Sequence, residues 1–153
     1  MSDLGPALTV WTDSLLSLKA ASEAQKAGRW EEFRTELGQY MAEQKSAKKA
    51  FADVTAPPTL SALHEGVVRG IGQSISGMNR FRKAFKAYGS APTVSSRDET
   101  KLMGLWNAAC DDGIESALAM RLWAVALATD MDDAGVPEPQ WLRDGVSRLK
   151  EAL

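Results

Sequence analysis

The sequence contains one histidine, His64, and one cysteine, Cys110. A single cysteine excludes an internal disulfide and a zinc site built from several cysteines. A single histidine excludes the usual carboxylate-bridged di-iron bundle, which needs two Glu-x-x-His motifs. A catalytic triad would have to use this same His64, and nothing near His64 or Cys110 indicates an activated nucleophile. We therefore expect no catalytic residue, no cofactor and no metal ligand, and we expect the chain not to be an enzyme.

Long apolar runs are also missing, since none approaches the roughly 20 residues that cross a bilayer. The first residues, 1–11, have neither a basic n-region nor a small-residue cleavage signal. These features predict a cytoplasmic protein that does not bind membranes. The net charge of −2 gives no global reason to expect nucleic acid as a partner.

The charge is unevenly distributed. Residues 1–92 hold 12 Lys/Arg against 9 Asp/Glu, and residues 93–153 hold 6 against 11. Attraction between two parts of one domain would explain this difference without any partner. A local basic cluster falls at the end of the expected helix 59–88, where cations favour the helix dipole, so that it needs no ligand; it consists of Arg80, Arg82, Lys83 and Lys86.

Apolar residues recur at helical spacing almost throughout the chain, and no alternating pattern typical of a strand is present. A length of 153 residues with 44% apolar content suits one domain with one core. We predict an all-α, single-domain helical bundle, with a four-helix core and an additional C-terminal helix. The expected helices cover residues 6–27, 29–54, 59–88, 97–133 and 139–153.

Local signals set the expected helix ends. Gly28 ends the first helix, the two prolines of residues 56–58 end the second, and Gly135 with Pro137 ends the fourth. Ser96 stands three residues before Glu99, a spacing that predicts a capping box at the start of the fourth helix.

A strip of small residues runs along one face of the expected helix 59–88, at Gly66, Gly70, Ser74 and Gly77. The surrounding stretch, GVVRGIGQSISG, is not a phosphate-binding loop, because no strand precedes it and a helical stripe crosses it. Each mid-helix glycine costs about 0.5–1 kcal/mol relative to alanine, which close packing can offset. We expect Ala47 and Ala50 of the preceding helix to lie against this strip. A groove for a partner helix or an apolar ligand is the alternative.

The expected helix 97–133 is apolar over more than half of its circumference. Such a helix is central, or it carries a second face for a partner. Three of the five tryptophans fit core stripes: Trp11, Trp30 and Trp106. Two lie outside the main stripes, where large aromatic residues are common interface anchors. Core burial is nevertheless the favoured interpretation for each of these two, and an interface role is the alternative. The candidate interface residues are Trp123, Trp141, Leu122 and Val125.

Several titratable residues favour structural roles. We expect Cys110 to be buried and inert, with the neighbouring acid Asp111 raising its pKa, and His64 to lie at the surface or to cap a helix. The run Asp130 to Glu138 resembles a calcium loop, but Ala134 and Trp141 occupy two positions that need oxygen ligands. Its aspartates lie at the C-terminal end of the expected helix 97–133, where the helix dipole disfavours negative charge. Contact with a cation or a basic partner would relieve this and is an alternative to a solvated helix end. The acidic face formed by Asp111, Asp112 and Glu115 has no apparent catalytic partner.

Taken together, these features favour a non-enzymatic protein that mediates protein–protein interaction as an adaptor, accessory or inhibitor, with a homodimer as one form. The alternative is a sensor or carrier of an apolar small molecule. Its pocket would lie beside the glycine strip and be lined by Met78, Phe81, Met103 and Trp106. Fold-level reasoning does not identify the partner.

Overall fold

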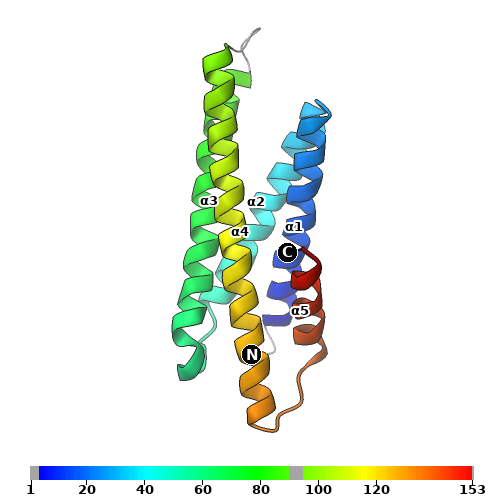
Figure 1. Ribbon diagram of the computed structural model, residues 1–153, viewed down its shortest axis with the longest axis vertical. Coiled ribbons are helices and arrows are strands. Elements are labelled where there is room, and N and C mark those ends of the chain that lie inside the picture. Colours follow the sequence, from blue (N-terminus) through cyan, green and yellow to red (C-terminus); the bar gives the residue numbers. More distant parts are fainter. Residues whose placement is uncertain (1–3, 90–94, 153) are drawn as a thin grey trace.

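The computed structural model describes residues 4–89 and 95–152. All regular structure in these ranges is helical, which confirms the predicted all-α class. The α-helices are α1 (Leu4–Lys26), α2 (Trp30–Ala52), α3 (Ser61–Gly89), α4 (Ser96–Asp133) and α5 (Gln140–Ala152) (Figure 1). A short 3-10 turn, η1 (Pro58–Leu60), precedes α3.

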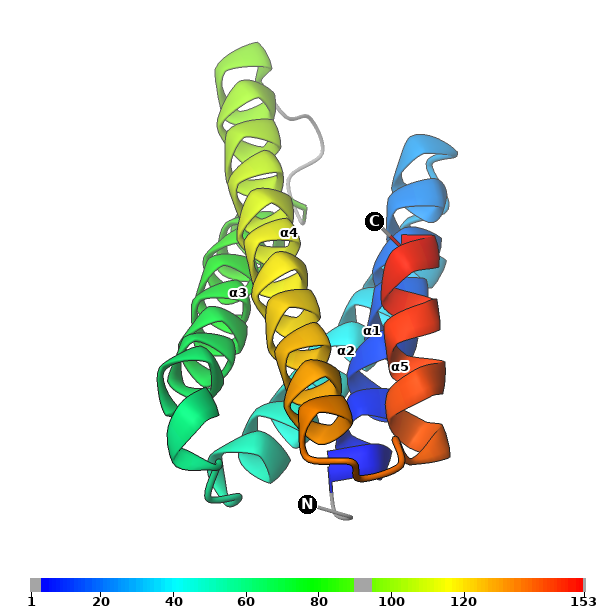
Figure 2. The same ribbon diagram turned by 60° about the horizontal axis from the view of Figure 1, so that its bottom comes forward.

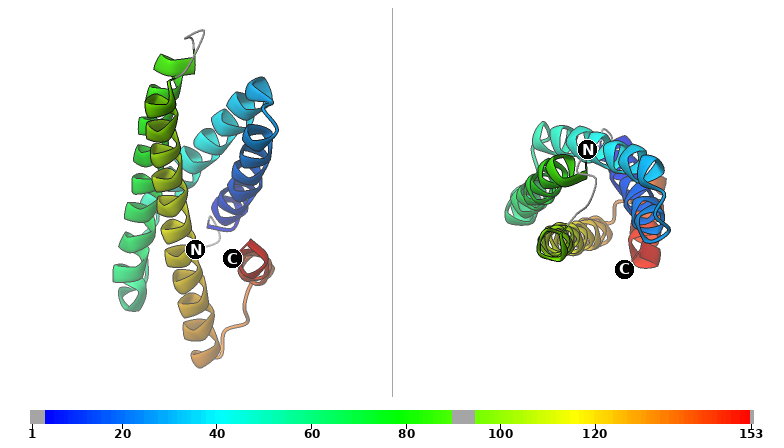
Figure 3. Two further views of the ribbon diagram at one scale, coloured as in Figure 1. Left: turned by 45° about the horizontal axis from the view of Figure 1, so that its top comes forward. Right: turned by 90° about the horizontal axis from the view of Figure 1, so that it is seen from above.

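The helices form two antiparallel hairpins, α1–α2 and α3–α4, which splay apart toward the end that carries the start of α2 (Figure 1). Seen from above, the helices follow an arc in the order α4, α3, α2, α1, α5 (Figure 3). The short α5 lies beside α1 and also contacts α4 (Figure 2). The predicted helical bundle is therefore present, and the additional C-terminal helix α5 packs against both α1 and α4.

The core consists of two apolar clusters. One gathers around Trp11, Phe51 and Trp123, and the other around Phe33 and Trp106. Between them, every long helix contributes small or polar buried residues: Ser14, Gln44, Ser74, Gly113 and Ser116. Two buried hydrogen bonds join helices in this layer: the Gln44 amide donates to Ser14 Oγ over 2.7 Å, and Tyr40 Oη lies 2.7 Å from Ser74 Oγ. Buried polar groups are retained where they find such partners.

The helix ends follow local chemistry. The expected ends differ from the observed ones by at most two residues. Gly28 and Gly135 adopt φ values of 71° and 69°, the left-handed conformation that ends a helix and favours glycine. The cap of α4 is displaced by one residue from the prediction, because Ser95 rather than Ser96 accepts a hydrogen bond from the Asp98 amide, over 3.2 Å.

Candidate functional site

The small-residue strip of α3 has more than one neighbour: Gly70 and Gly77 pack against α4, whereas Ser74 contacts α2. A Cβ added at Gly70 would lie 3.4 Å from Ser116 Cα, and one added at Gly77 would lie 3.5 Å from Ala109 Cα. Internal close packing is confirmed at these two glycines, but the expected contact with Ala47 and Ala50 is wrong. The helices α3 and α4 run side by side, while α2 diverges from α3 toward the splayed end (Figure 1).

The other two strip positions have different environments. Ser74 is fully buried and hydrogen-bonded to Tyr40 of α2. A Cβ at Gly66 would meet no heavy atom within 4 Å, which leaves this position open. The space beside Gly70 and Gly77 is occupied by α4, so the geometry does not favour the carrier alternative. Of the side chains expected to line its pocket, Met78, Phe81 and Trp106 are buried against one another, and Met103 is 43% exposed.

The tryptophans separate differently from the prediction. Trp123 is 1% exposed, and its ring packs edge-on against Phe51, with ring centroids 5.2 Å apart, so core burial is correct for Trp123 and the alternative role as an interface anchor is wrong. Trp141 is partly buried and its Cγ would lie 2.9 Å from a Cβ added at Gly5, which shows that this ring covers the start of α1. Trp30 is 46% exposed, although its heptad position predicted a core residue. It begins α2 at the splayed end, where no helix covers its outer side.

The remaining two candidate interface residues do lie on the surface. Leu122 is 62% exposed and Val125 is 43% exposed. Two further large apolar residues of α4, Ile114 and Leu118, are 52% and 48% exposed. These four side chains form the outer face of α4, the side opposite the residues that it buries against the bundle. We refer to them as the α4 face.

His64 is buried, so of its two expected roles the surface position is wrong and the helix-capping contact is found. It is 7% exposed, and its Nε2 lies 2.7 Å from the carbonyl oxygen of Phe51. This carbonyl belongs to the last turn of α2, where backbone oxygens lack helical partners. His64 therefore ties the start of α3 to the end of α2, a capping contact between two helices that sequence spacing does not reveal.

Cys110 is partly buried in α4 and packs against the second core cluster. Burial, followed by the charge of Asp111, raises the pKa of this thiol from 9.0 to about 11. The predicted direction is therefore correct, although burial is the larger cause. A thiol with such a pKa remains protonated at neutral pH and is a poor nucleophile.

A groove lies between α2 and α3 near the start of α2. Its volume is about 670 Å³, and its apolar floor consists of Phe33, Leu37 and Phe85. The rest of its lining is polar and exposed: Arg34, Asn79, Arg82, Lys83 and Lys86. We call this feature the basic groove. Three of the four residues of the predicted basic cluster line this groove: Arg82, Lys83 and Lys86. The fourth cation of the groove, Arg34, comes from α2, and no sequence pattern around Arg34 predicts that it lies beside this cluster.

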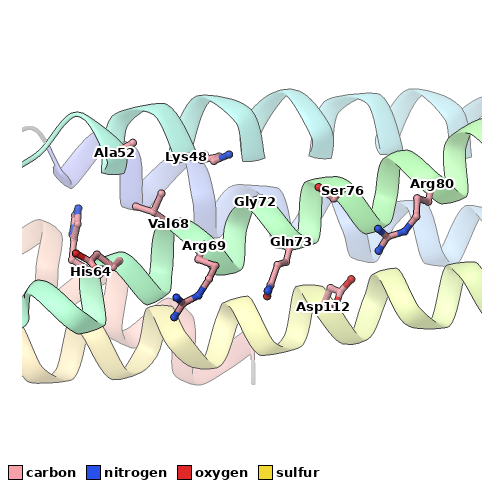
Figure 4. A pocket seen from close by; sticks show the side chains of 11 residues that line it. Lys48, Ala52, His64, Val68, Arg69, Gly72, Gln73, Ser76, Arg80 and Asp112 are labelled. Atoms are coloured by element: carbon pink, nitrogen blue, oxygen red, sulfur yellow. The ribbon is translucent and has the colours of Figure 1, made fainter.

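A second hollow, of about 900 Å³, follows the outer side of α3 (Figure 4). Arg69 extends from α3 toward α4, and Arg80 extends toward Asp112 of α4 (Figure 4). Lys48 reaches from α2, and its Nζ would lie 3.3 Å from a Cβ added at Gly72. Charges of both signs line this broad hollow, which also includes Glu65, so it does not select a charged ligand of either sign.

The acidic run after α4 is held by one contact to η1, where Thr59 Oγ1 donates to Asp130 Oδ2 over 2.7 Å. Within residues 4–89 and 95–152, no three His, Cys, Asp or Glu side chains are grouped as a metal site would require. In the same ranges no helix has the length and apolarity needed to span a membrane. No protein-family model, curated protein or solved structure matches this chain.

Proposed function

We propose that this chain is a non-enzymatic, cytoplasmic protein-interaction domain that self-associates through the α4 face. One observation carries the proposal: four large apolar side chains, 43–62% exposed, stand on successive turns of one helix. Single exposed apolar residues are normal on protein surfaces, but contiguous ones mark interaction sites. The spacing of four, four and three residues from Ile114 to Val125 keeps all of them on one side of α4.

The charges beside this face favour a second copy as the partner. Glu115 and Arg121 are exposed and flank the apolar row on opposite sides. When two identical helices pair in parallel about a two-fold axis, opposite flanks face each other. Glu115 of each copy then lies on the same side of the helix pair as Arg121 of the other copy. Charges of opposite sign therefore face each other across the interface.

The size of the face sets the expected strength. The row spans twelve residues, about 16 Å of helix from Ile114 to Val125. Four half-exposed side chains provide only a few hundred Å², less than the roughly 800 Å² per partner of a standard stable interface. We therefore expect a reversible dimer with a dissociation constant in the micromolar range rather than a permanent one.

Sedimentation equilibrium from low micromolar to submillimolar concentration tests this proposal. The mass should rise from 16.5 kDa toward twice that value as concentration increases. The double variant Leu118→Asp/Leu122→Asp should remain monomeric. Leu16→Asp is the matched control, because Leu16 is 66% exposed on α1, away from the α4 face, and its replacement should leave association unchanged. A wild-type protein that stays at 16.5 kDa throughout refutes self-association.

A further inference from the structure

The basic groove combines an apolar floor with walls of one charge. Phe33 and Leu37 of α2 and Phe85 of α3 form the floor. The four charged residues that line it are all cations, and no acidic side chain is among the lining residues. A groove bounded by charges of one sign raises the local concentration of molecules of opposite charge.

The cations that line the groove are exposed, and one of them, Arg34, lies over a floor residue. The guanidinium carbon of Arg34 lies 5.4 Å from the centroid of the Phe85 ring, within the range of a cation–π contact. Among the described residues, Arg82 and Lys83 form no ion pair. Their charges are therefore available to an approaching anion.

The floor is held in place by an aromatic cluster. Phe33 is fully buried, and its ring centroid lies 5.3 Å from that of Phe85 and 5.5 Å from that of Trp106. Trp30 continues the cluster toward solvent, 5.8 Å from Phe85. A surface that is already ordered loses little conformational entropy when a partner binds, so a preformed floor favours affinity.

We propose that the basic groove binds an acidic amphipathic helix of a partner protein. The partner's apolar residues at positions i, i+3 or i+4 and i+7 would lie on the partly exposed Phe85, and its carboxylates would face Arg82 and Lys83. The lining from Asn79 to Lys86 spans eight residues of α3, about 10 Å from the first to the last, or two turns of helix. The polar lining of the groove is exposed, so the groove does not enclose a bound molecule. Small-molecule pockets normally bury most of their ligand, and an open groove therefore suits a peptide better. The inference uses a different surface from the α4 face and does not depend on it.

The test uses a fluorescently labelled 14-residue peptide with leucines at the i, i+3/i+4 and i+7 positions and glutamates elsewhere. Fluorescence anisotropy should show saturable binding that weakens with added salt. The variant Arg82→Gln/Lys83→Gln should bind about three- to thirtyfold more weakly, the effect expected for two exposed charge contacts. The matched control is Arg69→Gln/Arg80→Gln, which also removes two positive charges from α3. Both of these residues lie outside the groove, so the control should bind the peptide like wild type.

Two further measurements place the peptide. Bound peptide should protect Trp30 from acrylamide quenching, measured as the difference between wild type and Trp30→Phe. A peptide with glutamine in place of glutamate should bind at least threefold more weakly. Equal losses in the groove variant and the control variant would overturn the proposal, as would the absence of saturable binding. Tighter binding of single-stranded poly-dT than of the acidic peptide would also overturn it, because cations beside aromatic rings can serve single-stranded nucleic acid. Thermal unfolding of each variant verifies that it is folded.

Discussion

Leucine in place of Gly70 should destabilise the protein, whereas leucine in place of Gly66 should not. Both glycines lie inside α3, four residues apart. At Gly70 an added Cβ would stand 3.4 Å from Ser116 Cα, so the backbone of α4 limits any larger side chain. At Gly66 an added Cβ would have no heavy atom within 4 Å.

The expected magnitude follows from two terms. Replacing a mid-helix glycine by leucine gains about 0.8 kcal/mol of helix propensity, and this gain is common to both positions. Forcing extra side-chain atoms into a closely packed contact costs about 1–3 kcal/mol, and only Gly70→Leu incurs this term. The free energies of unfolding of the two variants should therefore differ by about 1–3 kcal/mol, with Gly66→Leu above wild type.

Urea unfolding followed by far-ultraviolet circular dichroism measures this difference. Thermal midpoints should separate by about 2–4 °C for each kcal/mol in a domain of this size. Equal stability of the two variants would refute the packing of α4 on Gly70. Adding Ser116→Gly to Gly70→Leu removes Ser116 Cβ and Oγ, both 3.7 Å from the added atom, but keeps Cα, so it should restore part of the loss.

Gly145→Ala should lower stability by about 1–3 kcal/mol in urea unfolding, because the added Cβ would overlap the side chain of the buried Leu8; a wild-type midpoint would contradict this packing of α5 on α1. Tyr40→Phe should cost about 1 kcal/mol, since it removes the 2.7 Å partner of Ser74 Oγ, and the loss should disappear in the background Ser74→Ala. Stability should fall as the pH rises from about 9 toward about 11, because burial keeps the folded Cys110 thiol protonated while the unfolded thiol ionises first. In Cys110→Ala the free energy of unfolding should fall less steeply between these pH values. The same pH dependence as in wild type would contradict the raised pKa of the Cys110 thiol.

The helices could be predicted because their signals are local. Gly28 and Gly135 each supply a left-handed conformation that ends a helix within the same few residues. Apolar spacing then places the intervening segments in helices without reference to any other part of the chain. Ser95 and Ser96 show the limit of this reasoning, since two adjacent serines both fit the capping pattern and only the backbone path selects one.

Contacts between helices could not be predicted in the same way. The glycine strip of α3 indicates that something approaches closely, but small residues on both neighbouring helices satisfy this condition. Trp123 lies outside the stripe of large apolar residues on α4 because its own buried row includes the small residues Gly113 and Ser116. The spacing of Met120, Trp123 and Leu127 was a usable signal that this tryptophan is buried. Nothing local placed Arg34 beside the basic cluster of α3, because α2 and α3 meet only in the fold.

The α4 face and the basic groove belong to different helices, and this separation has a consequence for binding. The groove is formed by α2 and α3, so pairing through α4 leaves it uncovered in both copies. A dimer would then carry two grooves, and a partner with two acidic helices on a flexible linker would gain avidity of about 100-fold over a single helix. Leu118→Asp/Leu122→Asp should abolish this gain while leaving the affinity for a single helix unchanged. Equal affinity of wild type for the single and the tandem peptide, measured at concentrations where the dimer is populated, would show that the two surfaces do not act together.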